Sequence, residues 1–233
     1  MWSVRRRLAI AVAIGVVAAG AATGGIVLLS NHHAPGVFAL SSPAPATAAP
    51  LVGTWKVGSP SEAGYRAREK FINQPSTTEA VARTSSVSGG LRIKTEGGSY
   101  VATSIDVKVD LGSLVSQDRY ATYQAFQRDF FVRRIYLETS TYPVAEFKAD
   151  SATVLQDLTP GPVDLEVPGT LSAHGVTKKV TAKLRVQVTG DELEVVGSIN
   201  IDMRDFKVDP PDISFTKAEP GVVIEYHLFL SRV

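Results

Sequence analysis

The sequence of 233 residues contains no cysteine. This absence excludes disulfide bonds, a thiol nucleophile, thiolate metal ligands and a lipidated N-terminal cysteine, and it leaves the redox compartment open. There are only four histidines, and the sequence has no serine nucleophile elbow, no glycine-rich phosphate loop and no His-Glu-x-x-His pattern. We therefore expect a protein that is not an enzyme and that needs no cofactor.

A surplus of charge is also missing, since 24 basic residues face 23 acidic ones. Three of the basic residues, Arg5, Arg6 and Arg7, stand at the N-terminus. Without them 21 basic residues face 23 acidic ones, so the rest of the chain is mildly acidic. Nucleic-acid binding draws on a basic surface, and we expect no nucleic-acid partner.

The N-terminus carries the longest apolar run, because residues 8–29 include no charged side chain. About 20 apolar residues suffice for a helix to cross the hydrocarbon core. The preceding arginines should remain in the cytoplasm, which places the later residues outside the cell membrane. We expect residues 1–30 to be a basic end and single-pass transmembrane anchor. The alternative is a signal peptide cleaved in the alanine-rich stretch 44–48, which would leave a secreted protein.

Residues 31–52 are rich in alanine, proline, serine and threonine, a composition typical of an extended spacer. We interpret them as a linker between the membrane and a domain at residues 53–233. His32 and His33 lie in this linker, where a neighbouring pair predicts no metal site.

Within the domain, residues 161–188 predict a long β-hairpin that turns at His174-Gly175. A period of two gives each arm one apolar and one polar face. The apolar face of such a hairpin must be buried, either against further strands or against a ligand. The apolar positions of its two arms are Val163, Leu165, Val167, Leu171 and Ala173, then Val180, Ala182, Leu184, Val186 and Val188.

About eight segments show strand patterns, which favours an antiparallel barrel or sandwich. Charged residues along the polar faces exclude a lipid-facing exterior and predict a barrel that is polar outside and apolar inside. Residues 117–140 contain no glycine or proline and are dense in aromatics, and they predict one inserted helix. This helix could be ordinary core or an aromatic lid over a cavity.

The remaining polar candidates favour structural roles. Asp202, Asp205, Asp209 and Asp212 lack the glycine and terminal glutamate of a calcium loop, so we expect no metal there. His174 in the turn and His227 on a polar strand face are expected to be exposed and not catalytic.

Several short motifs, in order along the chain, resemble those of the YceI-like family. Residues 169–180, GTLSAHGVTKKV, are similar to its GxLxxHGVTxxV hairpin, and residues 142–148, YPVAEFK, to its YPxxxFK signature. Three shorter pieces also match, and the resemblance covers residues 53–233. These pieces are Gly53-Thr54-Trp55-Lys56-Val57, Arg128-Asp129 and Arg204-Asp205-Phe206.

This resemblance implies an extended antiparallel eight-stranded lipocalin-like barrel outside the cytoplasm, with a tunnel for a polyisoprenoid or similar lipid and no catalytic residues. It is also compatible with a homodimer. The sequence departs from the family at residues 65–69 and 135–139, which are expected to line or close the tunnel, so the ligand's identity stays open.

From the alternation and the aromatic segment we predict the residues that line a ligand cavity. The same alternation is compatible with packed side chains, and the alternative is a filled barrel that acts as a structural or protein-interaction module of the cell envelope. The predicted lining residues are Phe130, Phe131, Tyr136, Phe147, Leu171, Val180, Leu184 and Ile199.

Overall fold

The structure is a computed structural model that describes residues 32–42, 51–72, 76–119, 125–149, 153–155, 161–189, 191–213 and 216–233. The predicted anchor at residues 1–30 lies outside these ranges. Within them, no helix combines the length and apolar character needed to cross a membrane.

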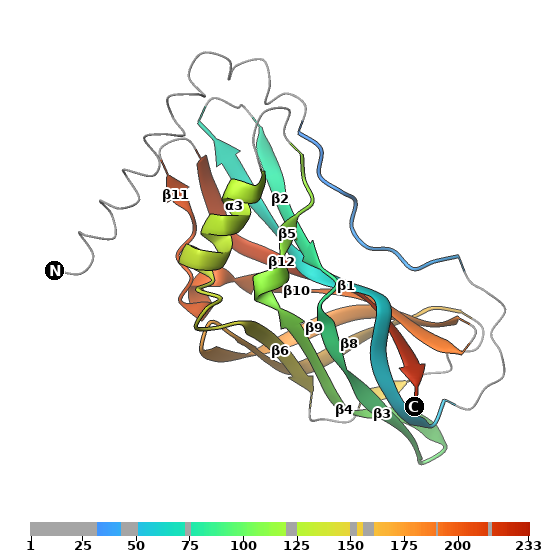
Figure 1. The fold of residues 1–233 in the computed structure, drawn as a ribbon. Helices are drawn as coiled ribbons and strands as arrows, with labels where there is room; N and C mark the ends of the chain where they lie inside the picture. Colours follow the sequence, from blue (N-terminus) through green and yellow to red (C-terminus); the bar gives the residue numbers. More distant parts are fainter. Residues whose placement is uncertain are drawn as a thin grey trace.

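The described chain is almost entirely β structure, interrupted by short helices (Figure 1). The strands are β1 (Gly53–Phe71), β2 (Thr77–Thr84), β3 (Val87–Glu96), β4 (Ser99–Asp110), β5 (Val115–Ser116), β6 (Val144–Ala149), β7 (Thr153–Leu155), β8 (Val163–Ala173), β9 (Val176–Thr189), β10 (Glu192–Asp202), β11 (Asp212–Ile213) and β12 (Thr216–Arg232). The helical turns are η2 (Leu111–Ser113), α3 (Ala125–Phe131), η3 (Val132–Tyr136) and η4 (Met203–Phe206).

The strands form one antiparallel sheet that closes on itself, because β12 pairs with β10 on one side and with β1 on the other. β2 and β3 pair with successive parts of β1, and β6 and β7 pair with successive parts of β4. Each of these pairs therefore fills one position around a closed barrel of eight strands. The predicted eight-stranded antiparallel barrel with one inserted helix is confirmed.

The β8–β9 hairpin forms as predicted, with its turn at His174 (φ 49°) and Gly175 (φ 70°). Two successive residues with positive φ give the turn whose twist matches that of the strands. Leu165 lies opposite Leu184, and Val167 opposite Ala182, so both arms direct the same apolar set into the barrel.

β1 is a single strand of 19 residues whose alternation is interrupted twice. Register shifts between Gly58 and Glu62 and between Ala67 and Glu69 offset its alternation. A bulge adds a residue to one strand and moves later side chains to the other face, which explains the irregular pattern of residues 65–72.

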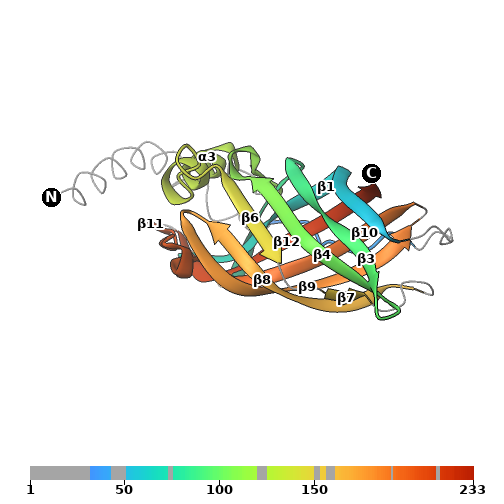
Figure 2. The same ribbon diagram turned by 90° about the horizontal axis from the view of Figure 1, so that it is seen from below.

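The inserted helix is shorter than the predicted range 117–140. The α-helix occupies Ala125–Phe131 and widens into a π-type turn at Val132–Tyr136. Gln117 and Asp118 belong to no helix, so the prediction that the helix begins at residue 117 is wrong. Figure 2 shows α3 and β11 at one end of the barrel, with the β3–β4 hairpin and the C-terminus at the other.

The end of the barrel remote from α3 is filled by a tightly packed cluster. Trp55, Ile93, Leu193 and Leu230 are each exposed by 3% or less, and the Trp55 indole donates a hydrogen bond to the Leu51 carbonyl at 2.8 Å. This cluster closes the barrel at that end.

Residues 32–42, which we call the strap, lie along the outer wall of the barrel. His33 exchanges two backbone hydrogen bonds with Arg119, of 3.1 and 2.9 Å. Further along, the Ser41 amide donates to Glu194 Oε1 at 2.8 Å. The sequence predicted a spacer over residues 31–52, but the described part of that stretch is held against the barrel.

Candidate functional site

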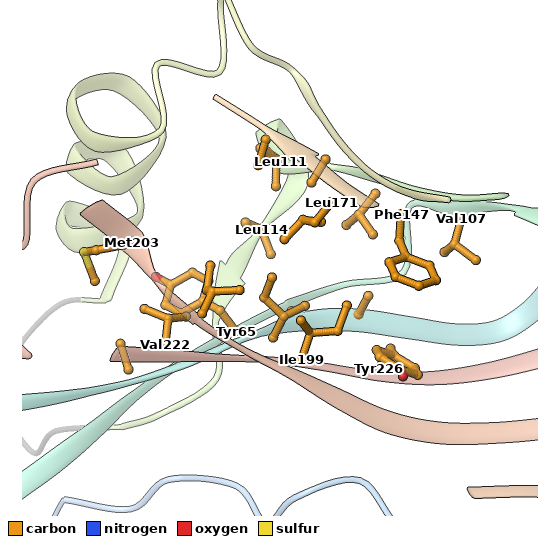
Figure 3. A pocket seen from close by; sticks show the side chains of 18 of the residues that line it. Tyr65, Val107, Leu111, Leu114, Phe147, Leu171, Ile199, Met203, Val222 and Tyr226 are labelled. Carbon is orange, nitrogen blue, oxygen red and sulfur yellow. The ribbon is translucent and has the colours of Figure 1, made fainter. Parts of the chain in front are cut away.

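The barrel encloses a cavity of about 370 Å³ that begins beside α3 and η3 and extends toward the closed end. Small-molecule sites commonly measure about 300–1,000 Å³. Strands from all around the barrel contribute to its wall, and Figure 3 shows their side chains pointing into a common space.

The inward side chains indicate that this space is not filled by the protein. Leu165, Leu184, Phe147 and Ile224 all face the lumen, yet each is only half-buried. In a close-packed interior such side chains would be fully covered by their neighbours. The cavity therefore interrupts the core between the closed end and α3.

Six of the eight residues predicted to line the cavity lie on its wall. Phe147 and Leu171 are direct cross-strand partners on β6 and β8, and Figure 3 shows both side chains directed into the cavity. The six are Phe131, Tyr136, Phe147, Leu171, Leu184 and Ile199.

Phe130 does not line the cavity, and its prediction as a lining residue is wrong. Its side chain is 54% exposed, whereas the neighbouring Phe131 faces inward. Consecutive residues on a helix point about 100° apart, so the two rings cannot share one face. Val180 shares the inner face of β9 with Ala182, but it packs into the adjoining core and not onto the cavity wall.

Several lining residues escaped the sequence analysis. β12 supplies Val222, Ile224 and Tyr226, and their alternation was visible in the sequence although none was chosen. Tyr65 also faces the cavity (Figure 3), but the bulges in β1 hid its orientation. Met203 belongs to η4, a helical turn that strand periodicity could not indicate.

The three lining tyrosines, Tyr65, Tyr136 and Tyr226, carry neutral hydroxyl groups. Burial raises the pKa of Tyr65 and that of Tyr226. The Tyr226 hydroxyl donates to the Lys183 carbonyl at 3.3 Å. The phenol of Tyr226 therefore adds an uncharged and largely apolar surface to the wall.

One ionic cluster lies at the α3 end of the cavity and fixes the helix to the barrel. Arg128 forms a bidentate pair with Asp118, with Nη1 2.8 Å from Oδ2, and lies 3.5 Å from Glu69. Burial alone would lower the pKa of Arg128, but the bonds and charge of Asp118 outweigh it and raise that pKa. Asp129 accepts from the Ser116 amide at 3.1 Å. The Arg128-Asp129 motif thus anchors α3 to β5 and β1.

Neither His174 nor His227 is exposed, contrary to expectation. His174 packs its ring against Tyr142 at 4.7 Å, and its Nδ1 lies 3.0 Å from the Phe206 carbonyl oxygen. His227 lies on the outer face of β12, where its Nε2 is 2.7 Å from Glu194 and the strap covers the pair. Both side chains are held by structural contacts.

Three of the four aspartates of residues 202–212 have cationic partners. Asp202 caps η4 and binds Arg204, which lowers the pKa of Asp202 to about 2. Asp205 lies 3.7 Å from Lys178, and Asp212 lies 2.9 Å from Lys217. Across the described ranges, no three histidine, aspartate or glutamate side chains are arranged to hold a metal ion.

Comparison with known proteins agrees with this architecture. The family model of the YceI-like domain matches residues 61–228. A solved polyisoprenoid-binding domain from Saccharophagus degradans, implicated in plant cell wall breakdown, is 19% identical with a TM-score of 0.54, over 78% of this chain and 99% of that one. BcnA of Burkholderia cenocepacia is 19% identical with a TM-score of 0.47, over 72% of this chain and 95% of that one. A Campylobacter jejuni YceI protein is 16% identical with a TM-score of 0.39, over 68% and 83%. No curated protein sequence gives a match.

The closed antiparallel barrel of eight strands and its apolar cavity place this chain among hollow β-barrel proteins. The Saccharophagus domain has the same fold. The family match covers most of the domain, and the chain belongs to the YceI-like family.

Proposed function

We propose that this protein binds a long apolar chain, a polyisoprenoid or a similar lipid, in the barrel cavity. The observation that carries the proposal is the cavity of about 370 Å³ with an almost entirely apolar wall. Each methylene group moved from water into such a site is stabilised by about 0.8 kcal/mol. Two of the polar groups at the wall, the Tyr226 hydroxyl and the Arg128 guanidinium, already have partners within the protein.

The distribution of the lining residues favours an extended ligand over a compact one. Met203 and Phe206 contribute at the α3 end, and Leu193 and Leu230 at the closed end, so the space follows the barrel axis. A flexible hydrocarbon chain suits a narrow apolar space of this kind. The polyisoprenoid-binding description of the Saccharophagus domain supports the same class of ligand.

The proposed location rests on the sequence alone. The apolar run at residues 8–29 would hold the protein in the cell membrane with its barrel outside the cytoplasm, close to the bilayer where isoprenoid lipids reside. A filled-barrel interaction module is the weaker candidate, because an open interior serves no purpose in it.

The proposal is tested by the lipid that remains bound to the full-length protein purified from bacterial cells. Native mass spectrometry and organic extraction should find a long-chain lipid at about one molecule per barrel, since the cavity has the volume of a single site. Ala182→Phe should reduce that occupancy, because Ala182 is 2% exposed and lines the cavity.

Thr181→Phe is the matched control, since Thr181 is the adjacent residue of β9 and points outward. It should retain the lipid of the unmodified protein. The proposal fails if the unmodified protein carries no lipid, or if the two variants retain equal amounts while both remain folded by circular dichroism.

A further inference from the structure

The strap begins at the end of the barrel where the cavity begins. His33 is hydrogen bonded to Arg119, and His32 Nε2 lies 3.6 Å from Asp118, the carboxylate that binds Arg128 of α3. The start of the described chain is therefore fixed beside α3.

From there the strap follows the outer wall to the closed end. The Pro35 carbonyl accepts from Arg66 at 2.9 Å, and the Gly36 carbonyl accepts from Arg83 at 2.6 Å. The Phe38 ring lies under the Arg83 guanidinium at 3.9 Å. At the far end Ser41 binds Glu194, which is fully buried. Figure 1 shows residues 32–42 as the blue trace along the barrel.

The α3 end also exposes apolar surface around the cavity. Ile135 both lines the cavity and is 37% exposed, so the cavity reaches the surface at η3. Phe130, one turn earlier, is 54% exposed with the Arg134 guanidinium 5.8 Å from its ring. Val144, at the start of β6, is 44% exposed. The opposite end is sealed by the cluster around Trp55 and Leu230.

Three peptide steps separate Leu29, the last residue of the apolar run, from His32. An extended chain covers at most about 11 Å in three steps. A membrane span at residues 8–29 would therefore leave the bilayer within about 11 Å of His32, whose side chain lies beside Asp118 at the α3 end. Without the strap, the chain that comes from the membrane would first join the barrel at β1. The first residues of β1 belong to the closed end.

We infer that the α3 end of the barrel docks on the surface of the lipid bilayer, so that the cavity opens toward the membrane. The strap sets this orientation, and Phe130 and Ile135 enter the headgroup region while Arg134 reaches toward lipid phosphates. Exposed aromatic and aliphatic side chains with nearby arginine are typical of surfaces that lie in the membrane interface. This inference rests on the proposed lipid-binding function and adds the route by which the lipid enters.

The absence of cysteine makes the orientation directly measurable. Single cysteines at Phe130→Cys and Thr95→Cys can each carry a fluorophore in the full-length protein, and Thr95 is exposed in the β3–β4 hairpin at the far end. The protein is placed in phosphatidylcholine vesicles with brominated acyl chains, and unbrominated vesicles give the reference intensity.

The label at position 130 should lose roughly threefold in fluorescence, because interfacial side chains insert about 5–10 Å toward the acyl chains. The label at position 95 should be unchanged. Equal quenching at both positions, no quenching at either, or stronger quenching at position 95 would each overturn the docking.

A flexible insertion tests whether the strap orients the barrel, or whether attachment to the membrane is sufficient without it. A Gly/Ser insertion of about 20 residues between Asn31 and His32 adds roughly 25 Å of mean reach, so quenching at position 130 should fall to near the reference value. The same insertion after Ser42 lengthens the chain beyond the strap and should leave the quenching intact. If the two insertions have the same effect, the strap does not orient the barrel.

Native mass spectrometry of the same labelled samples distinguishes the two proposals. Bound lipid without quenching at position 130 would overturn the docking and leave the proposed function standing. Quenching at position 130 without bound lipid would support the docked orientation and count against the proposed function.

Discussion

Two glycines allow aromatic side chains to form part of the cavity wall. A Cβ atom added at Gly169 would lie 2.4 Å from the Lys148 carbonyl oxygen and 2.6 Å from the Phe147 ring. A Cβ atom at Gly197 would lie 2.5 Å from the Tyr226 hydroxyl. The tip of each ring therefore occupies the space that a side chain at the glycine would need, and the shape of the cavity depends on these two positions.

Gly169→Ala should destabilise the barrel by about 1–3 kcal/mol, because an overpacked core side chain forces its neighbours to move. The backbone oxygen of Lys148 cannot move without disturbing the β6–β8 pairing. Urea unfolding followed by circular dichroism measures the change. Gly221→Ala on β12 is the control, since an added Cβ meets nothing within 4 Å, and an equal loss in both variants would refute the packing argument.

Glu194 is a carboxylate on the outer wall of the barrel, and its side chain is fully buried. It accepts hydrogen bonds from Ser41 of the strap and Gln187 of β9, and it pairs with His227. Burial alone would raise the pKa of Glu194, but these hydrogen bonds outweigh burial and lower that pKa. Because the folded-state pKa lies below the ordinary value, ionised Glu194 stabilises the fold.

Glu194→Gln should lower the free energy of unfolding at pH 7 by about 1.5–3 kcal/mol, the range for hydrogen bonds to a charged group. The contribution is complete above the ordinary glutamate pKa of about 4.3 and is lost as the pH falls through the lowered folded-state pKa. The difference in free energy of unfolding between the unmodified protein and Glu194→Gln should therefore narrow below about pH 4. Glu166→Gln, an exposed pair with Lys183, should show no such gap at pH 7. A gap for Glu194→Gln that stays constant from pH 7 to pH 3 would contradict this assignment.

At the scale of elements, the sequence predicts best what depends on neighbouring residues. The β8–β9 hairpin follows from alternation within each arm and from the His174-Gly175 turn. The choice between Phe130 and Phe131 could not be made, because it requires the phase of a helix that begins at Ala125 and not at residue 117. A shift of a few residues rotates every side chain on such a helix.

The strap could not be predicted from the sequence. Its composition is typical of a linker, and its partners are far away in the chain: Ser41 and Glu194 are 153 residues apart, and Ser41 and Gln187 are 146 apart. These contacts exist only after the barrel has closed and brought β9, β10 and β12 side by side.

Removal of the strap should destabilise the barrel. A variant without residues 1–42 should unfold about 2–4 kcal/mol more easily than one without residues 1–31, because the hydrogen bonds to Arg66, Arg83 and Glu194 are lost while the ordering entropy of the strap is regained. Chemical unfolding of the two truncated proteins measures the difference. Equal stabilities would mean that the strap is not bound in solution.

At the scale of the whole molecule, the closed barrel was predictable and its hollow interior was not. Alternating apolar residues on β8, β9 and β12 require a covered inner face, but they are the same whether side chains or a ligand provide the cover. Whether the interior is filled or hollow depends on the summed volume of all the side chains that point into the barrel. Small residues such as Ala63, Ala67 and Ala182 on the wall leave space that Phe147 and Tyr226 do not fill.

The central claim is that this space holds a lipid chain, and a crystal structure of the protein purified from bacterial cells without delipidation tests it most directly. We predict elongated electron density that starts between Phe131 and Tyr136, passes Phe147 and ends short of the cluster at Trp55. Opposite walls of the barrel in direct side-chain contact, with no continuous density between them, would contradict the account.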